Sequence, residues 1–404
     1  MTEKDLRQIW VRDLPPEWHL IRASLAVKGV ERPPLDGDEV ITCFRDGEVT
    51  LRSNRRTDGY TVAFKEFGYQ HIDPGDLVIH SMDGGWGAIG VSDSSGKASP
   101  VVHAYRSAEN DLGFIAYVLR AMAFSGFLIA QSKGIRERST QFDRRTFANL
   151  YLPLPPLEEQ RRIVDYLDDE VRETDVLIVE LQRLVADLSS RRAKLVEEAC
   201  GQAKESKARV GLVAKCVRRG ISPSYCEETG LRVINQKCVR PQGDVDFGWS
   251  RLHDDGSVPV SEVMLLRTGD ILINSTGTGT LGRVAFVGEK LLEPTTFDSH
   301  VTLVRPDEKK VKPSYLAWMI HAQEKRLIDL SVGSTNQIEL SRQTVMRLEF
   351  PLPSLERQCE IADELDRETA EMDFLIKEAT ELIENLKARK TALITEVVKG
   401  RKKA

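Results

Sequence analysis

Five loops in the sequence combine Arg or Lys with small polar residues, and these side chains could hydrogen-bond to nucleic acid. Arg reads guanine and Asn or Gln reads adenine through paired hydrogen bonds, while Gly lets the backbone approach a phosphate. The candidate DNA-contacting residues are Arg52, Asn54, Arg55 and Arg56 in LRSNRR; Lys133, Arg136 and Arg138 in SKGIRERS; Arg218 and Arg219 in KCVRRGISPS; Asn274, Thr276, Thr278 and Arg283 in NSTGTGTLGR; and Ser334, Thr335, Asn336 and Gln337 in GSTNQ. Any one of these loops also fits an ordinary solvated surface, so the nucleic-acid interpretation depends on the group.

Catalytic motifs are missing from the same sequence. Gly96-Lys97 is followed by Ala98 and lacks the upstream Gly of a phosphate-binding loop. There is no Asn/Asp-Pro-Pro-aromatic tetrapeptide of an amino-methyltransferase and no G-x-S-x-G, and the acidic residues near Pro306 are too compressed for a nuclease cluster. This predicts a binding or targeting subunit rather than an enzyme.

The six cysteines and seven histidines predict no metal site. No two cysteines form a C-x-x-C pair, and no H-E-x-x-H occurs. Cys216, Cys226 and Cys238 are the closest group, and their spacing fits no zinc module. We therefore expect reduced structural thiols.

Composition favours a soluble protein with two domains. The chain has 404 residues, of which 41% are hydrophobic and 29% charged. No run of eighteen apolar residues occurs, and the N-terminal MTEKDLRQIW lacks a secretory apolar core, so we expect a cytoplasmic protein. The net charge of −5 and the pI of about 5.9 argue mildly against nucleic-acid binding. Most of the excess acid, however, lies in two helical segments, 156–200 and 354–404.

An internal repeat organises the chain. PLPPLEEQ at Pro153 returns as PLPSLERQ at Pro351, 198 residues later, and the same offset holds without a gap for about forty residues. Each copy leads into a stretch without Pro or Gly, from Leu157 to Cys200 and from Leu355 to Lys399. Both stretches are therefore predicted to be long helices, each about 66 Å long at ~1.5 Å per residue.

Apolar residues recur in these helices at spacings of three and four, which indicates a heptad seam. Arg192 and Lys390 are the matching polar positions in the two copies. The main seam residues are Leu167, Ile178, Leu181, Leu188, Leu365, Ile376, Ile383 and Leu386. The simplest interpretation is that the two seams bury each other in an antiparallel coiled coil. The alternative is that each helix packs only on its own domain.

The segments that precede the helices also resemble each other. PGDLVIHSMDGGWGAIG at Pro74 and TGDILINSTGTGTLGRV at Thr268 each read as a turn, a short strand and a Gly-rich loop, and a short amphipathic helix follows in each half. We predict an α+β protein with small mixed or antiparallel sheets and helices. Its expected parts are a globular domain 1–155, a spacer helix 156–200, a globular domain 201–353 and a spacer helix 354–404.

This order of elements resembles the specificity subunit of type I restriction-modification enzymes. The resemblance rests on the duplicated P-L-P-x-L-E-x-Q lead-in with its helix, the Leu14-Pro15-Pro16-Glu17-Trp18 stretch, the G-D-[LI]-[LV]-I strand and the Gly333-Ser334-Thr335-Asn336-Gln337 loop, and it covers essentially the whole chain. It implies two target-recognition domains that each read one half of a bipartite site in double-stranded DNA. It also implies helices that set the spacing.

The same resemblance implies partners, and it places the cofactors on them. Two modification subunits would carry S-adenosylmethionine and methylate adenine, and restriction subunits would use ATP and Mg. This chain would hold no cofactor and act in DNA methylation and phage defence. In many members the N-terminal residues complete the second helix region. The first half departs from the pattern, with Gly84-Gly85-Trp86-Gly87 in place of a small-polar loop.

Two other functions remain open at this point. One is a protein-only scaffold in which the globular halves bind proteins. The other is the specificity module of a related methylation-based defence system. The loop chemistry separates the first of these from a DNA-targeting subunit, whereas the second differs only in its partner proteins.

Overall fold

The computed structural model describes residues 9–11, 13–55, 67–131, 142–201, 207–277, 279–331 and 339–404. The chain divides into two compact units. The first unit contains Met1–Glu180 and Glu381–Ala404, and the second contains Leu181–Thr380. The first unit is therefore built from both ends of the chain.

The first unit contains a four-stranded antiparallel sheet with the strand order β2-β9-β6-β7 and three strand pairs. The sheet strands are β2 (Lys28–Val30), β6 (Leu77–His80), β7 (Ile89–Val91) and β9 (Val102–Arg106), and the pairs are β1 (His19–Arg22) with β10 (Tyr151–Leu154), β3 (Ile41–Cys43) with β4 (Val49–Leu51), and β5 (Gln70–Ile72) with β8 (Gly96–Ala98). The short helices are α2 (Ala23–Ala26), α3 (Leu112–Phe124), α4 (Phe127–Gln131) and α5 (Arg144–Asn149), with 3-10 turns η1 (Arg52–Asn54) and η2 (Gly84–Trp86).

The second unit repeats this plan. Its main sheet has the order β12-β19-β16-β17, and a second four-stranded sheet has the order β13-β15-β14-β18. The strands are β11 (Lys207–Arg209), β12 (Ala214–Arg219), β13 (Tyr225–Cys226), β14 (Leu231–Ile234), β15 (Arg251–His253), β16 (Ile271–Asn274), β17 (Val284–Phe286), β18 (Thr295–Phe297), β19 (Val301–Pro306) and β20 (Glu349–Pro351). The helices are α7 (Val210–Val213), α8 (Pro313–His321), α9 (Glu324–Asp329) and α10 (Arg342–Arg347), with 3-10 turns η3 (Phe247–Trp249) and η4 (Glu262–Met264).

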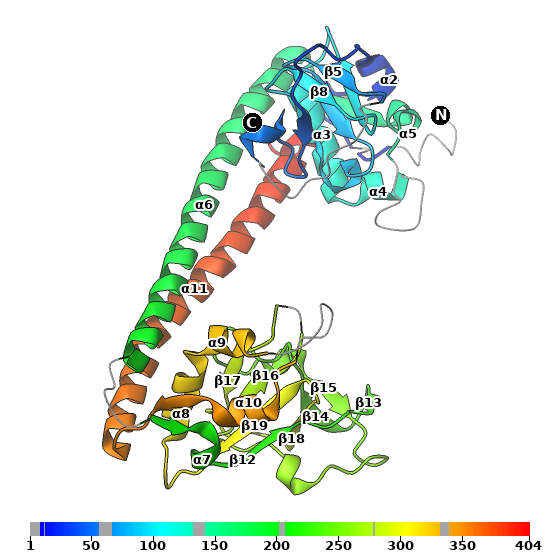
Figure 1. The fold of residues 1–404 in the computed structure, drawn as a ribbon. Coiled ribbons are helices and arrows are strands. Elements are labelled where there is room, and N and C mark those ends of the chain that lie inside the picture. The colour runs from blue at the N-terminus through cyan, green and yellow to red at the C-terminus, as the bar shows by residue number, and fades with distance from the viewer. Residues whose placement is uncertain are drawn as a thin grey trace. The chain divides into compact units, whose positions relative to one another are not determined.

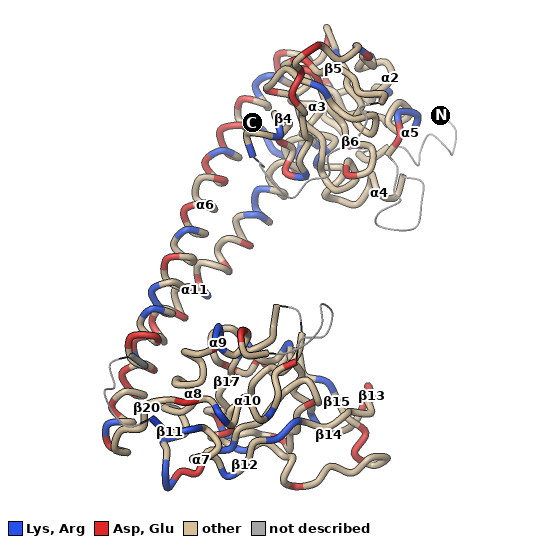
Figure 2. Tube along the Cα trace, viewed as in Figure 1, with Lys and Arg blue, Asp and Glu red and all other residues tan. Residues whose placement is uncertain are grey.

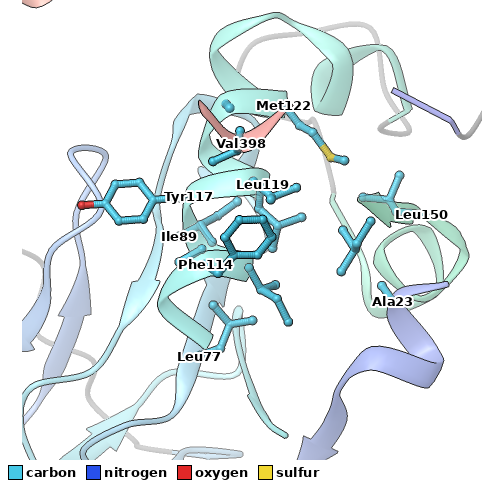
Figure 3. Packing of buried hydrophobic residues seen from close by; sticks show 14 of the residues in the cluster. Ala23, Leu77, Ile89, Phe114, Tyr117, Leu119, Met122, Leu150 and Val398 are labelled. Atoms are coloured by element: carbon cyan, nitrogen blue, oxygen red, sulfur yellow. The ribbon is translucent and has the colours of Figure 1, made fainter. Parts of the chain in front are cut away.

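Each main sheet lies between two apolar cores, because alternate residues of a strand point to opposite faces. On β6, Leu77 and Ile79 join the core beside α3, whereas Val78 joins the core beside the smaller strand pairs. In the close-up of the first core, Phe114 and Leu119 of α3 lie among Leu77 and Ile89 of the sheet (Figure 3). The sheet is thus a middle layer in each unit, with helices on one side.

The Asp of the repeated G-D turn is a buried carboxylate at the start of a central strand of each main sheet, β6 or β16. Asp76 is fully buried and receives hydrogen bonds from Arg32 Nη1 (2.6 Å) and Arg106 Nε (2.5 Å). Asp270 is also buried and forms a two-point contact with Arg305, at 2.8 and 2.7 Å. Gly75 and Gly269 have φ values of +84° and +92°, which favour Gly at the preceding position. The duplicated turn is therefore a structural anchor for the Arg of the neighbouring strand.

Two long helices, α6 (Leu157–Gly201) and α11 (Leu355–Val398), contribute to both units (Figure 1). In the first unit, Ile163 and Leu167 of α6 share a core with Ile394 and Val397 of α11. In the second unit, Val196 of α6 shares a core with residues near the start of α11. The helices therefore run in opposite directions, which confirms the predicted antiparallel pairing and α+β duplication. No helix among the described residues is both long and apolar enough to cross a membrane.

The predicted seam positions are the shielded positions of these helices. Five of them, Leu167, Ile178, Leu365, Ile376 and Ile383, are buried. The other three, Leu181, Leu188 and Leu386, are half-buried.

The polar positions of the seam form two equivalent ion pairs. In the first unit, Lys390 pairs with Asp175. In the second unit, Arg192 Nε lies 2.8 Å from Asp373 Oδ1. The 198-residue repeat relates Arg192 to Lys390 and Asp175 to Asp373, so one contact occurs twice. A polar pair inside an apolar seam favours one register, because a slipped helix would leave buried charges without partners.

The buried Gln of each lead-in motif connects a long helix to its unit. Gln160 accepts a hydrogen bond from the backbone N–H of Asp111 (2.9 Å) and donates to the carbonyl of Pro155 (2.9 Å). Gln358 accepts from the backbone N–H of Lys312 (2.8 Å) and donates to the carbonyl of Pro353 (2.8 Å). Asp111 and Lys312 are the residues at which α3 and α8 begin. The amide therefore joins two helix starts in each unit.

The described part of the N-terminal segment packs at the end of α11. Ile9 bridges to Tyr151, and Lys399 Nζ lies 4.4 Å from the centre of the Trp10 ring. A Cβ added at Gly400 would come within 2.5 Å of Pro15 Cγ. Trp10 and Pro15 therefore lie beside the C-terminal end of α11 within the first unit.

Replacing Gln160 or Gln358 by Ala should destabilise the unit that contains it. Each change leaves a buried backbone N–H and a buried carbonyl without partners, and each such group costs about 1–3 kcal/mol. Urea denaturation should show a lower midpoint for the affected unit, and amide exchange should accelerate at the start of α3 or α8. Gln182→Ala, at an exposed position of α6, is the matched control. Equal effects from Gln182→Ala and Gln160→Ala would contradict the assignment.

The first unit should lose stability as pH rises above about 6.5. His71 is buried between Asp38 Oδ2 (2.8 Å) and Asp73 Oδ1 (3.0 Å), and the hydrogen bond to Asp38 raises the pKa of His71 in the folded state. A raised pKa stabilises the fold fully below the unfolded pKa, and this contribution disappears as pH rises through the folded pKa.

His71→Gln should flatten the dependence of the urea midpoint on pH in this range. His19→Gln, at an exposed position of the same unit, should leave that dependence unchanged. A wild-type midpoint that stays constant through this range would contradict the prediction.

Candidate nucleic-acid interface

Strand register brings several loops of the second unit to one end of its sheets. Arg219 of β12 lies opposite Thr302, and Asn274 of β16 lies opposite Val301, so both residues are near the start of β19. In the second sheet β14 and β18 run parallel, and both end at this side. We call this surface the second loop end and define it as residues 218–225, 235–237, 249–251, 274–277, 279–283 and 298–300.

The second loop end contains the described members of two predicted DNA-contacting loops. Arg218 is exposed, whereas Arg219 Nη1 pairs with Glu339 Oε1 at 2.8 Å. Thr276 Oγ1 lies 2.7 Å from His300 Nδ1, and Arg283 donates to the carbonyl of Gly279 (3.0 Å). Lys and Arg positions are visible on β12 and beside β15 (Figure 2). Arg218 is therefore the most available cation among these predicted residues.

The remaining predicted residue of this surface that the structure describes is Asn274, which lies inside. Its side chain is fully buried, and its Nδ2 donates to the carbonyl of Gln236 at 2.9 Å. Burial turns this amide into a support for the loop above it, so any contact of Asn274 with DNA would require the loop to move. Thr278 and the four residues Ser334, Thr335, Asn336 and Gln337 lie outside the described residues.

Glycine at position 277 is favoured by its backbone conformation. Its φ is +105°, and an added Cβ would lie 2.1 Å from Gln236 Oε1. Gly279 has a φ of +78°, and an added Cβ there would meet no atom within 4 Å. The Gly-rich loop therefore packs tightly at one residue and is open at another, where its backbone is accessible to a large ligand.

A carboxylate and an aromatic ring lie beside this loop. Burial raises the pKa of Asp298, although a hydrogen bond from the backbone N–H of His300 (2.9 Å) opposes that rise. Partial burial also raises the pKa of Tyr225. The guanidinium of Arg251 stacks 3.5 Å from the centre of the Tyr225 ring. The sequence analysis missed Tyr225, Gln236, Arg251 and His300, which only strand pairing brings to this surface.

The first unit has an equivalent end, which we call the first loop end and define as residues 80–87, 101–103 and 142–144. The backbone N–H of Ser81 donates to Val101 (2.7 Å), as that of Ser275 donates to His300 (2.8 Å). The carbonyl of Ser81 accepts from Phe142 (2.8 Å), as that of Ser275 accepts from Leu340 (2.9 Å). The two loop ends therefore share a backbone framework.

The side chains of the first loop end differ from those of the second. His80 takes the place of Asn274, and His103 takes the place of Thr302, with its Nδ1 accepting from Arg144 Nε at 3.1 Å. Burial lowers the pKa of both histidines, so their rings are neutral near pH 7. Trp86 is 38% exposed, and Asp83 pairs with Arg45 at 2.7 Å. The likeness of VIHS and LINS in the two strands could have revealed His80.

Arg52, Asn54 and Arg55 lie in and directly after the 3-10 turn η1, which follows β4, and they contact nearby residues of the same unit. Arg55 pairs with Asp46 (2.8 Å) and Glu48 (2.7 Å), Asn54 donates to Thr50 (2.8 Å) and Arg52 donates to Thr42 (3.3 Å). The structure thus gives these three residues intramolecular partners. Arg56, Lys133, Arg136 and Arg138 lie outside the described residues.

Neither unit presents a metal centre within the described ranges, where no group of three or more His, Cys, Asp or Glu is placed to hold an ion. The cysteines whose side chains the structure describes, Cys43, Cys216, Cys226, Cys238 and Cys359, are free thiols. Burial raises the pKa of Cys238 to about 11 and raises that of Cys43 further. These two thiols are therefore protonated at neutral pH and poor nucleophiles.

Similarity to known proteins covers most of the chain. Residues 50–182 and 232–385 match the family described as "Type I restriction modification DNA specificity domain". The specificity subunit of the type I restriction enzyme EcoBI from Escherichia coli is 24% identical over 63% of this chain, and the match spans 59% of that relative. The specificity subunit of the enzyme MjaVIII from Methanocaldococcus jannaschii is 22% identical over 90% of this chain and 88% of its own length.

A solved structure has the same fold. It comes from work described as "Structural basis underlying complex assembly and conformational transition of the type I R-M system", and its TM-score is 0.71 at 19% identity. The comparison covers 97% of this chain and 100% of that chain. The two family matches fall on the two halves of the duplication, and each contains three of the four strands of a main sheet. The chain therefore belongs to the type I restriction-modification DNA specificity family.

Proposed function

We propose that this chain reads a bipartite site in double-stranded DNA, one half with each loop end. The observation that carries the proposal is that the two loop ends share one backbone framework and differ in their side chains. Equivalent hydrogen bonds position Ser81 and Ser275, whereas the first loop end carries Asp83 and Trp86 and the second carries Thr276 and Arg283. A shared framework with different polar groups suits two surfaces of one function that recognise different base sequences.

The proposal also gives the two long helices a role in assembly. Exposed leucines repeat at matching positions outside the seam, with Leu177 and Leu184 on α6 and Leu375 and Leu382 on α11. Their exposed fractions are 41–45%, and each pair is seven residues apart. Apolar side chains that repeat in this way favour docking of partner helices. Two copies of one modification subunit would use the two equivalent helices.

Catalysis belongs to the partners in this proposal. The modification subunits supply S-adenosylmethionine-dependent adenine methylation, and restriction subunits supply ATP-dependent cleavage. The present chain selects the DNA and sets the gap between half-sites. Its acidic helices leave DNA attraction to local cations such as Arg218, so affinity depends on the modification subunits that complete the complex.

Arg218→Ala should weaken DNA binding by about 1–3 kcal/mol without loss of the modification subunits. Arg218 is exposed at the second loop end, and its removal takes away a cation that can contact a base or a phosphate. The assay is DNA affinity of the complex with its modification subunits, on the split motif found by methylation mapping of genomic DNA. Lys215→Ala, another exposed cation on β12, is the control.

The outcomes of that experiment separate the possible functions. A split motif with methylated adenine in each half, together with weaker binding by Arg218→Ala, supports the proposal. A stable complex that yields no motif would support a protein-only scaffold. Equal binding by wild type and Arg218→Ala at every salt concentration would exclude Arg218 as a DNA contact.

Removing one heptad from both helices should shorten the unspecified gap and leave both half-sites intact. Deletion of residues 180–186 and 378–384 keeps the heptad phase and retains the ion pairs of Asp175 and Asp373. Seven residues of helix span about 10 Å, which is roughly three base pairs of DNA. Methylation mapping gives the new gap. Deletion from one helix alone should disrupt the seam, and an altered half-site with an unchanged gap would contradict the spacing role.

A further inference from the structure

The most exposed aromatic side chain at either loop end is Trp249. It lies beside the end of strand β14, although it is distant from that strand in the sequence. Its side chain is 53% exposed, compared with 38% for Trp86 and Tyr225. Trp and Tyr are enriched at contact surfaces, because their rings add apolar area and their N–H or O–H groups can find a partner. The surroundings of Trp249 show what that site would bind.

The turn that carries Trp249 is held in place at several points. Asp246 accepts a hydrogen bond from the backbone N–H of Gly248 (2.9 Å), and Asn235 donates to the carbonyl of Trp249 (2.7 Å). Arg232 donates to Ser250 Oγ at 3.0 Å. Phe247, on the same turn, packs against a buried core. The indole is therefore presented on a rigid support, which lowers the entropic cost of binding.

Two aromatic rings of the second loop end, Trp249 and Tyr225, each have a cation over them. Lys237 Nζ lies 5.5 Å from the centre of the Trp249 ring, and Arg251 stacks on Tyr225. Neither cation forms an ion pair with a carboxylate in the described part of the chain. A guanidinium that stacks on a ring keeps its in-plane N–H donors available. The surface thus combines apolar area with positive charge.

Three nearby carboxylates are engaged within the fold, whereas Glu227, directly after β13, is exposed. Asp246 caps the Trp249 turn, and Glu293 pairs with Arg232 at 3.0 Å. Asp298 accepts the backbone N–H of His300. Exposed cations that are not paired within the fold are complementary to a polyanion. DNA therefore fits this surface better than a protein partner that has few acidic residues.

We propose that Trp249 is a DNA contact of the second unit, packing its indole against sugar and base edges while Lys237 and Arg251 contact the flanking phosphates. This inference rests on the proposed function and extends it. The contact surface would then reach from Arg218 and the Gly-rich loop to the turn before β15, a segment that the predicted loops did not include. Trp249 would add affinity and shape selection to the second half-site only.

The test uses the complex of this chain with its modification subunits and DNA that carries the mapped site. Trp249→Ala should weaken binding about 10-fold and leave the salt dependence of log K unchanged, because no charge is lost. Lys237→Ala should lower the slope of log K against log salt by about 0.9, the value for one phosphate contact. Trp249→Phe should retain most of the affinity. Leu292→Ala, at a 98% exposed position before β18, is the control and should bind normally.

Half-site specificity provides the second measurement. For DNA changed only in the second half-site, the affinities of wild type and Trp249→Ala should differ by less than 10-fold. For DNA changed only in the first half-site, the 10-fold difference in affinity should remain. Unaltered DNA affinity of Trp249→Ala would overturn the inference. Loss of modification subunits by Trp249→Ala would also overturn it and assign the turn to a protein partner.

Different results would overturn the proposed function and the Trp249 contact. A wild-type complex that methylates no split motif would overturn the proposed function and this inference together. A wild-type complex with a split motif and a Trp249→Ala variant that binds equally well would overturn the inference alone. Thermal unfolding of Trp249→Ala should match wild type, because the exposed indole is absent from the buried cores.

Discussion

The antiparallel seam between α6 and α11 is the constraint on which both units depend. Neither unit completes its core with residues that are close together in the chain. Ile394, Val397 and Val398 from the C-terminal helix enter the first core, and Val196 from the central helix enters the second. Val398 is seen beside Leu119 and Met122 in the close-up view of the first core (Figure 3). Coiled-coil formation and domain folding are therefore coupled.

The two seam ion pairs add specificity to this apolar contact. Buried charges cost desolvation energy, so pairs such as Arg192 with Asp373 contribute more to register than to stability. Arg192 also donates to the carbonyl of Gln242 and lies 5.4 Å from the Trp318 ring. A shifted helix would break these contacts together. The equivalent ion pair of Lys390 with Asp175 defines the register at the other end of the helix pair.

The duplication separates residues that support the fold from residues that differ between units. Gln160 and Gln358, and likewise Asp76 and Asp270, occupy matching positions and bond to matching groups. Asp168 and Asp366 accept hydrogen bonds from Tyr117 and Trp318, so even a changed partner keeps the contact. The loop ends show the opposite behaviour, with one backbone arrangement and different side chains. Within this chain, the repeat therefore keeps the contacts that support the fold and changes the side chains at the loop ends.

Sequence alone determined the duplication, the two long helices, their seam and the family, because these features follow from periodicity and from a repeat that is visible in the letters. Period and capping act locally, and Pro and Gly limit the helices directly. Only the tertiary structure decided which polar residues are free. Asn274 and Arg55 are residue types that can read DNA bases. In the folded protein, however, Asn274 is buried and Arg55 is held in ion pairs. Tyr225, Arg251 and Trp249 come together through pairing of strands distant in sequence, and such long-range contacts leave no local pattern from which to predict them.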